Sequence, residues 1–268
     1  MGALHPPRRP EAAPARPPGP SPRLSPRLSI VIPTLDEAAL IEGCLLPLQP
    51  LREAGCEVLV ADGGSRDATA ALAAPLADRV LQAPRGRAAQ MNAGALAARA
   101  PVLLFLHADT RLPPGAMGAA LEGLAASGRG WGRFEVRLDG SHPLLRVVER
   151  AMGLRSRLTG ICTGDQALFV ERELFWRVGG YPPIPLMEDV ALSRLLKRAA
   201  GRPLCLGLAV RTSARRWEGE GVLRTIGLMW ALRAAYALGA DPARLHRLYY
   251  GRPPGPGPDT PGEAREEA

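Results

Sequence analysis

Short apolar runs alternate with helical patterns along the first half of the chain. Residues 28–32, 57–61, 79–81 and 102–106 are predicted to form strands, because each run is short, apolar and bounded by turn residues. The segments between these runs carry apolar residues at helical spacing. This β-α-β-α-β-α-β order predicts an α/β fold with a doubly wound, mostly parallel sheet.

The predicted helices differ in how clearly the sequence bounds them. Pro47 and Pro50 are expected to kink or end the first helix, which starts near Glu37. Alanine-rich helices are expected from Asp67 onward and over residues 86–100. Later elements follow less regularly, with a helix at 114–126, strands at 131–138 and 167–170, and a helix that opens at residues 187–189.

The two ends of the chain lack this periodicity. Residues 1–27 are rich in proline and arginine, and residues 252–268 combine proline and glycine with an acidic end. Segments of this kind bury too little apolar surface to fold. We therefore expect two disordered tails around one domain at residues 28–251.

Composition and charge favour a soluble protein with an anionic ligand. Hydrophobic residues make up 46% of the 268 residues and aromatic residues only 4%, so the core must consist mainly of Ala, Leu and Val. The net charge is +8, and the domain keeps a positive charge when the tails are set aside. That balance suits a nucleotide diphosphate or an anionic membrane surface. Nucleic acid is not an expected partner, because no arginine cluster is interleaved with aromatic residues.

Cysteine spacing and hydropathy indicate the compartment. The four cysteines form no CxxC or metal-type spacing, and no signal peptide is evident, which favours a reduced cytoplasmic protein. The longest run without a charged residue, Ala88–Ala98, has eleven residues, whereas a membrane-spanning helix needs about 20. Residues 222–238 suit a helix packed on the sheet or, with Arg224 and Arg233 reaching lipid phosphates, an interfacial helix. We expect at most peripheral contact with the inner face of the membrane.

Polar residues follow each of the four predicted strands. Thr34 and Asp36 follow the first strand, Asp62 the second, Arg87 the third and Asp109 the fourth. The carboxyl ends of parallel strands meet at one edge of a sheet, and open α/β sheets bind their ligands there. The sequence therefore predicts a ligand site at this edge.

The loops after the second and fourth strands carry the clearest chemistry. Asp62 in ADGGSRD can accept hydrogen bonds from a base or a ribose, or the segment is an ordinary strand-to-helix turn. Asp109 in HADT offers a hard oxygen ligand for Mn²⁺ or Mg²⁺ carrying a diphosphate, or is only a turn residue. His107 beside it can touch the metal or the substrate, or cap the strand. Neither GxGxxG nor Walker spacing is present, which counts against a dehydrogenase and a P-loop NTPase.

Three polar segments lie in the second half of the chain. Asp165 and Gln166 precede an apolar run, and Glu188 and Asp189 open a helix, where acids are also favourable partners of the helix dipole. Residues 213–217 (SARRW) offer two guanidinium groups and an indole, or form a solvated basic loop. Candidate chemistry is therefore spread over the whole domain.

Seven segments, in this order and spacing, resemble family 2 glycosyltransferases with the GT-A fold. Within that family, the segments are most similar to a bacterial subgroup labelled as arsenosugar-biosynthesis-associated glycosyltransferases. The resemblance covers about residues 28–250 and rests on SIVIPTLDE, ADGGSRDAT, GRAAQMNAGA, LLFLHADT, TGDQALFV, GGYPPIPLMEDVALSRLLK and TSARRW. It implies one GT-A glycosyltransferase domain at 28–251, with UDP- or GDP-sugar as donor and Mn²⁺ or Mg²⁺ as cofactor.

The resemblance also implies a role for each matching residue. Asp189 is the general base, and Asp109 is the metal ligand. The residues implied to bind the nucleotide sugar are Thr34, Asp36, Asp62, Arg87 and Asp109. The residues implied on the acceptor or diphosphate side are Asp165, Gln166, Glu188, Arg216 and Trp217.

Two positions depart from the family pattern. Asp36 replaces the usual Asn of the first motif, and His107 stands at the first position of the Asp-x-Asp motif. Metal coordination is therefore expected to rest on Asp109 and the diphosphate alone.

The expected reaction transfers a sugar from a nucleotide-diphosphate donor to an acceptor hydroxyl, with inversion at the anomeric carbon. Two other classes stay open. A nucleotidyltransferase would normally carry a glycine-rich basic loop after the first strand, where this chain has residues 34–37 (TLDE). A non-catalytic binder of anionic membranes or nucleic acid would leave the acids at the strand ends without a purpose.

Overall fold

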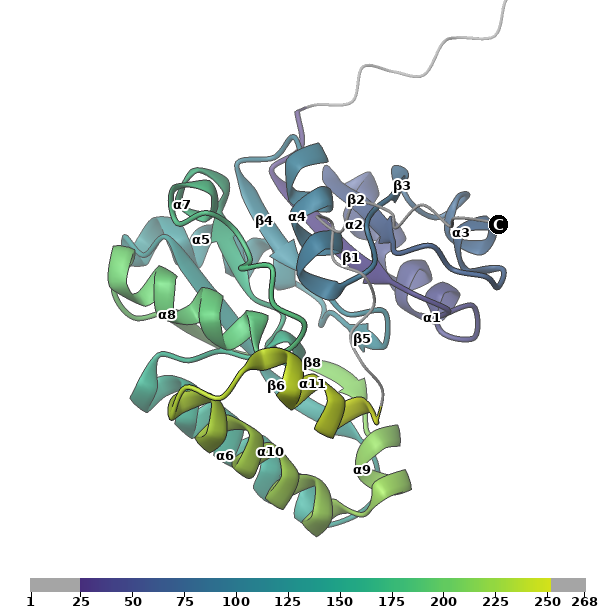
Figure 1. The fold of residues 1–268 in the computed structure, drawn as a ribbon. Helices are drawn as coiled ribbons and strands as arrows, with labels where there is room; N and C mark the ends of the chain where they lie inside the picture. The colour runs from purple at the N-terminus through teal and green to yellow at the C-terminus, as the bar shows by residue number, and fades with distance from the viewer. Residues whose placement is uncertain (1–24, 252–268) are drawn as a thin grey trace, which may run out of the picture.

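A computed structural model describes residues 25–251 (Figure 1). The tails expected at 1–27 and 252–268 lie outside the described residues, apart from residues 25–27. An eight-stranded sheet crosses the described chain in the order β3-β2-β1-β4-β7-β6-β8-β5. The strands are β1 (Leu28–Thr34), β2 (Cys56–Asp62), β3 (Arg79–Gln82), β4 (Val102–Phe105), β5 (Thr110–Arg111), β6 (Trp131–Asp139), β7 (Phe169–Glu171) and β8 (Leu204–Ser213).

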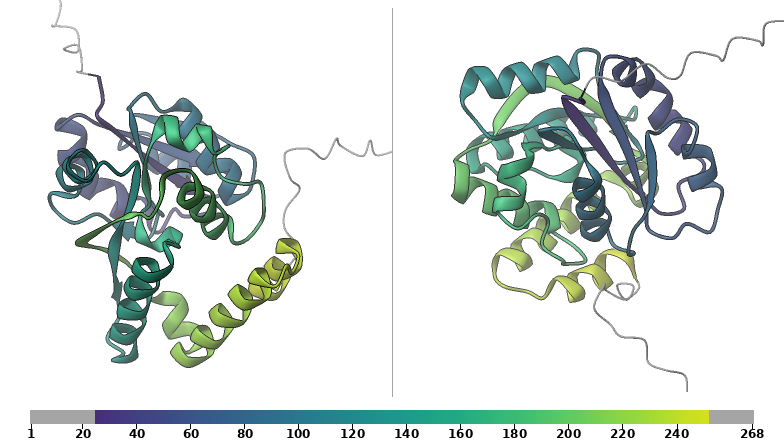
Figure 2. Two further views of the ribbon diagram at one scale, coloured as in Figure 1. Left: turned by 90° about the vertical axis from the view of Figure 1, so that its left-hand side faces the viewer. Right: turned by 90° about the horizontal axis from the view of Figure 1, so that it is seen from above.

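Helices cover both faces of this sheet (Figures 1 and 2). They are α1 (Ile41–Leu45), η1 (Leu46–Leu48), α2 (Gln49–Glu53), α3 (Thr69–Ala73), α4 (Arg87–Ala97), α5 (Ala116–Ser127), α6 (Leu144–Thr159), η2 (Gly164–Gln166), α7 (Arg172–Arg177), α8 (Glu188–Ala200), α9 (Arg215–Glu220), α10 (Val222–Ala237) and α11 (Pro242–Tyr250).

The sheet has a parallel half and a mixed half. Strands β3, β2, β1 and β4 are all parallel, which confirms the doubly wound order predicted for the first part of the chain. Strand β7 is antiparallel to both β4 and β6, whereas β6 and β8 are parallel. The parallel half brings the loops after β1, β2 and β4 to one edge, as a parallel sheet requires.

Strand β1 explains why helices are needed on both faces. Ile30 and Ile32 lie in the larger core with α1, α5 and α6, while Val31 points into a second core with α4, α7 and α8. A strand buried on both faces is stable only when each face is covered. On the α4 side the approach is close, because a Cβ added at Gly94 would lie 2.3 Å from Cγ1 of Val31.

The first two helical segments follow the proline and capping signals. The segment after β1 is interrupted by the 3₁₀ turn η1, which contains Pro47, so the predicted kink is confirmed. Helix α3, expected from Asp67 onward, begins at Thr69 and has five residues. Its start is fixed because the Thr69 N–H donates to Asp67 Oδ1 at 3.0 Å, and Pro75 limits its extension.

The C-terminal helices form their own layer at one end of the molecule (Figure 2, left). Helix α10 contacts mainly α9, α11 and α6, while Val222 and Ile226 near its start pack in the larger core. Leu232 of α10 and Leu245 of α11 belong to a third, smaller core. The opposite side of α10 is exposed, with Trp230 72% accessible. No helix within residues 25–251 has the length and apolar character needed to cross a membrane.

Candidate active site

A cavity of about 780 Å³ lies between the ends of the sheet strands and helices α8 to α11. The loops after β4 and β8 supply one wall, and the three C-terminal helices supply another. Seven of the eleven site residues predicted from the sequence line it: Arg87, Asp109, Asp165, Glu188, Asp189, Arg216 and Trp217. The fold therefore brings together segments that are more than one hundred residues apart.

Thr34, Asp36 and Asp62 do not line this cavity but join two loops at the same sheet edge. The buried Asp62 carboxylate accepts hydrogen bonds from the N–H groups of Gly64 (3.1 Å) and Ser65 (2.9 Å), and from the hydroxyls of Thr34 (3.3 Å) and Ser65. A carboxylate has about four lone-pair positions. In this structure Asp62 therefore orders its own loop.

Asp36 fastens the loop after β1 to the loop after β2. Its N–H donates to Ser65 Oγ at 2.9 Å, and its carboxylate accepts from the Arg66 N–H at 2.8 Å. Its φ of 55° lies in the left-handed region. Asn and Asp are the non-glycine residues that tolerate this region best. The Asp that replaces the usual Asn therefore meets the same backbone requirement.

Gln166 also lies outside the cavity, although the resemblance implied a place on the acceptor or diphosphate side. It is fully buried, accepts from the Thr163 N–H at 3.1 Å and donates to Ser156 Oγ at 3.2 Å. Together with Thr163 it forms the capping box of η2. Its role in the fold is to hold the short helix that presents Asp165.

Asp165 and Asp189 reach the cavity from different elements. Asp189 lies in the first turn of α8, and its carboxylate accepts from the Gly164 N–H at 2.8 Å. Asp165 Oδ1 lies 3.6 Å from Nδ1 of His107, in the loop after β4. Burial raises the pKa of Asp165, but the hydrogen bond and charge of His107 and the charge of Arg87 outweigh it, so the net pKa is lowered. Asp165 is therefore an ionised neighbour of Asp189.

His107 is pressed against the backbone of η2. A Cβ added at Gly164 would lie 2.5 Å from the His107 ring, so this position has no room for a side chain. Thr110 N–H donates to the His107 carbonyl at 3.0 Å. These contacts fix the loop that also carries Asp109.

Arg87 and Glu188 form an ion pair on the cavity wall, at 3.2 Å between Nη1 and Oε1. Glu188 is almost fully buried, and that burial raises its pKa, although Arg87 opposes the shift. Arg87 also donates through Nη2 to the hydroxyl of Tyr250 at 3.3 Å. Tyr250 and its neighbour Tyr249 line the cavity but were not predicted. Two adjacent tyrosines, in a chain with only four, were the available signal.

Arg216 comes from helix α9, so the SARRW segment is not a solvated loop. Its guanidinium lies 3.6 Å from the ring centre of Tyr249 and donates through Nη2 to the Tyr249 carbonyl at 3.0 Å. Glu220 Oε1 lies 3.3 Å from its Nε. Trp217 also lines the cavity and packs against the larger core. Arg87 and Arg216 thus enter the cavity from two helices, α4 and α9, that are far apart in the sequence.

Asp109 supplies a carboxylate beside these groups. Its Oδ1 accepts hydrogen bonds from Thr110 Oγ1 at 3.1 Å and Thr212 Oγ1 at 3.4 Å. Within residues 25–251 no group of three or more His, Cys, Asp and Glu side chains has the geometry to hold a metal ion. Mg²⁺ is often bound by one or two carboxylates and completes its coordination with phosphate oxygens and water. Asp109 fits that pattern.

Backbone strain is concentrated around these elements. Among the described residues, three non-glycine residues have a positive φ: Asp36 (55°), Ala167 (45°) and Met187 (69°). Ala167 follows η2 directly, and Met187 precedes the first turn of α8. Such conformations cost about 1–3 kcal/mol each and persist where the surroundings impose them.

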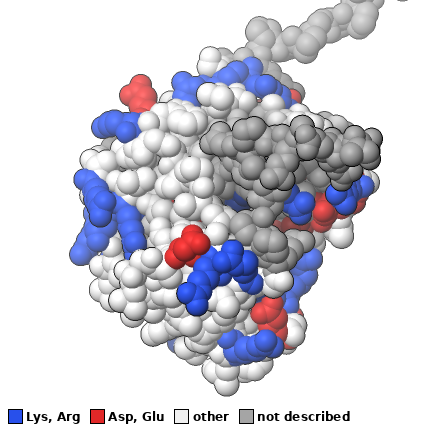
Figure 3. Space-filling view, in the orientation of Figure 1, with Lys and Arg blue, Asp and Glu red and all other residues white. Residues whose placement is uncertain are grey.

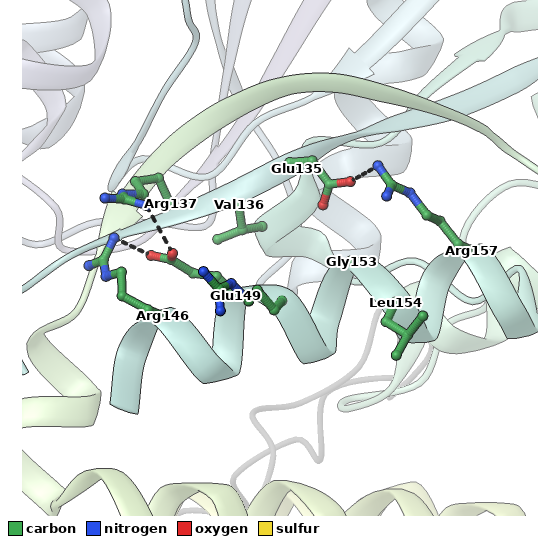
Figure 4. Close-up of a pocket in the computed structure, with 9 residues that line it drawn as sticks. Glu135, Val136, Arg137, Arg146, Glu149, Gly153, Leu154 and Arg157 are labelled. Carbon is green, nitrogen blue, oxygen red and sulfur yellow. Dashed lines mark hydrogen bonds and ion pairs between the residues drawn. The ribbon is translucent and has the colours of Figure 1, made fainter. Parts of the chain in front are cut away.

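A second hollow, of about 700 Å³, lies between β6 and α6 (Figure 4). None of the predicted site residues lines it. Several of its charged groups pair with one another, as Arg146 does with Glu149 at 2.7 Å and Arg157 with Glu135. On the face shown in Figure 3, basic side chains lie in separate groups, several beside acidic ones, and form no continuous stripe. The larger cavity is therefore the candidate active site.

Solved structures share this fold at low sequence identity. A mannosyltransferase from Pyrobaculum calidifontis, in complex with GDP-Man and Mn²⁺, has a TM-score of 0.60 and 22% identity over 90% of this chain and 68% of its own. TarS 1-349 of S. aureus in complex with UDP-GlcNAc has a TM-score of 0.56 and 16% identity over 70% of this chain. This chain spans 58% of that TarS chain.

Glucosyl-3-phosphoglycerate synthase from Mycobacterium tuberculosis is similar as well. Its complex with Mn²⁺, UDP and glucosyl-3-phosphoglycerate has a TM-score of 0.51 and 19% identity, over 69% of this chain and 70% of its own. No curated protein sequence matches the chain. Residues 29–159 match the family described as Glycosyl transferase family 2. The chain thus has the α/β GT-A fold, and its residues 29–159 resemble glycosyl transferase family 2.

Proposed function

We propose that this protein is an inverting glycosyltransferase that uses a nucleotide-diphosphate sugar. One observation carries the proposal. The candidate cavity is lined by four arginines, of which Arg87 and Arg216 suit a diphosphate, and by carboxylates that suit a metal and an acceptor hydroxyl. The nucleotide sugars bound by the mannosyltransferase and by TarS support GDP- or UDP-sugar as the donor class. The acceptor stays unspecified, and the arsenosugar-associated subgroup stays an expectation from the sequence.

Asp189 is the proposed general base. As the acceptor oxygen attacks the anomeric carbon from the face opposite the nucleotide, its proton passes to the Asp189 carboxylate. The bond from the anomeric carbon to the diphosphate oxygen breaks, and its electron pair leaves with the nucleotide. General-base help of this kind contributes about 10²–10⁴-fold. The transition state has oxocarbenium character, as in glycoside chemistry.

Arg87 and Arg216 are proposed to bind the diphosphate and stabilise its developing charge. Asp109, with the diphosphate oxygens, would hold a divalent ion such as Mn²⁺ or Mg²⁺, which supplies further positive charge to the leaving group. Mn²⁺ in two of the similar structures supports this assignment. Thr34, Asp36 and Asp62 are proposed to shape the adjoining wall for the base and ribose. Asp165, Glu188 and Trp217 would face the acceptor or diphosphate.

We also propose that the protein is cytoplasmic, with at most peripheral membrane contact and no nucleic-acid partner.

The test of the proposed function incubates the full chain with a panel of UDP- and GDP-sugars and Mn²⁺. Release of free UDP or GDP, together with thermal stabilisation by the same donor, is the expected result. Release of pyrophosphate would identify a nucleotidyltransferase instead. The proposal would be overturned if neither a free nucleoside diphosphate nor pyrophosphate is released and no nucleotide stabilises the protein.

A further inference from the structure

The last two residues of helix α11 contact Arg87 and Arg216, two of the four arginines that line the candidate site. Tyr249 stacks on Arg216, with 3.6 Å between the guanidinium carbon and the ring centre. Tyr250 accepts a hydrogen bond from Arg87 at 3.3 Å, and its ring lies 5.6 Å from the Arg216 guanidinium. Arg87 and Arg216 are far apart in the sequence. The tyrosine pair is therefore the point at which they are joined.

The pair is held firmly by its own helix. Asp241 caps the start of α11 by accepting from the Ala243 N–H at 3.0 Å, and Leu245 is buried in the third core. The two tyrosine rings pack edge to face with 4.6 Å between their centres. Burial raises the pKa of Tyr249 to about 12, although Arg216 opposes the shift, so its ring is neutral at physiological pH.

These contacts suit the recognition of a diphosphate. A guanidinium binds phosphate oxygens best when its plane is fixed, because its N–H groups form a rigid fork. A ring stacked on the guanidinium face fixes that plane without itself occupying an N–H group. In Arg216 the Nη2 and Nε groups already face the Tyr249 carbonyl and Glu220. Arg87 is fixed differently, by Glu188 on one nitrogen and the Tyr250 hydroxyl on the other.

We propose that Tyr249 and Tyr250 are positioning residues for the nucleotide diphosphate, acting through Arg216 and Arg87. The inference rests on the proposed function, because it takes these arginines as the diphosphate ligands. It makes helix α11 part of the donor site, although the family match ends at residue 159. Tyr249 acts through its ring face, and Tyr250 acts through its hydroxyl.

The test measures the dissociation constants of UDP and GDP, each with Mn²⁺, by calorimetry on the full chain. Tyr249→Leu removes the ring. It should weaken the binding of whichever nucleotide the wild type binds by about tenfold. Tyr249→Phe keeps the ring and should bind within about twofold of the wild type. Tyr250→Phe removes only the hydroxyl and should weaken binding about threefold. These losses should be larger for the diphosphate than for the matching monophosphate, which a merely structural effect would not produce.

A matched control exists on the neighbouring helix. Tyr236 of α10 packs against Arg194 at 5.0 Å in the same kind of contact but does not line the cavity. Tyr236→Leu should bind nucleotide as the wild type does.

The outcomes separate the two proposals. A wild type that binds neither UDP nor GDP would overturn the proposed function. A wild type that binds, with Tyr249→Leu and Tyr250→Phe binding equally well, would overturn the positioning role alone. If Tyr249→Leu does not fold, as judged by circular dichroism, Tyr250→Phe decides: weakened diphosphate binding supports the role, and unchanged binding overturns it.

Discussion

The backbone N–H of Gly164 donates a hydrogen bond to the carboxylate of Asp189 at 2.8 Å, which joins the short helix η2 to the start of α8. The other carboxylate oxygen accepts from the Val190 N–H at 2.7 Å. Each oxygen keeps a second lone pair. The carboxylate is therefore fixed in direction and still able to accept a proton from the cavity.

Replacing this carboxylate should separate chemistry from binding. Asp189→Asn is nearly isosteric and should lower sugar transfer by about 10²-fold or more, because the amide cannot take the acceptor proton. The affinity of the donor site, measured by calorimetry with UDP or GDP in place of the nucleotide sugar, should stay close to that of the wild type. Asp165→Asn, which lines the same cavity, is the comparison. If Asp165→Asn abolishes transfer and Asp189→Asn does not, the two roles must be exchanged.

Asp109 should control the metal dependence of binding. Asp109→Asn removes the negative charge that a divalent ion needs, so most of the gain in nucleotide affinity caused by Mn²⁺ should be lost. Titrations with and without Mn²⁺ measure that gain. Asp139→Asn is a suitable control, because this exposed carboxylate of β6 pairs with Arg211 and does not line the cavity. A full Mn²⁺ effect in Asp109→Asn would contradict the assignment.

Because α4 approaches β1 closely, we expect two glycine-to-alanine variants to change the free energy of unfolding in opposite directions. Gly94→Ala places a methyl group 2.3 Å from Val31 and should lower the free energy of unfolding by about 1–3 kcal/mol. In Gly118→Ala, in helix α5, the nearest atom lies 3.6 Å away, so the helix-favouring effect of alanine should raise stability by about 0.5 kcal/mol. Denaturant unfolding measures both. Equal shifts in the two variants would show that the contact with Val31 costs nothing.

Thiol reactivity should distinguish the cysteines. All four are free, and burial raises the pKa values of Cys44, Cys56 and Cys162 to about 12. At pH 8 these three thiols are almost entirely protonated and should resist alkylation. Cys205 is partly exposed and should react first. Mass spectrometry after a short iodoacetamide pulse tests this, with the unfolded chain as the fully labelled control. Early labelling of any buried cysteine would show local opening of its core.

Much of the fold was predictable from the first half of the chain. Runs such as LSIVI are short and, apart from Ser29, apolar because β1 is buried on both faces, and its alternate residues enter two different cores. The kink at Pro47 also followed from local chemistry. The placement of α10 did not, because its apolar residues fit a helix packed on a sheet equally well. Only tertiary contacts with α9 and α11 decide between these arrangements.

The site was predictable where a residue lies at the end of an element. Asp109, Asp189 and Arg87 line the cavity because strand ends and helix starts meet at one edge. Gln166, predicted on the acceptor or diphosphate side, does not line the cavity, because a polar side chain in a motif gives no sign that a capping box will bury it. The Tyr249–Tyr250 pair was missed because no spacing marks it. Its significance depends on two arginines that are distant in the sequence.

The left-handed backbone at Asp36, Ala167 and Met187 limits how this sequence can diverge. A β-branched residue is strongly disfavoured at such a φ, whereas Gly, Asn and Asp are tolerated. Random drift toward Val, Ile or Thr at these three positions should therefore be purged even in a lineage that has changed its sugar or its acceptor. An engineer seeking variants with a new substrate preference should leave these positions untouched and diversify the cavity walls between them.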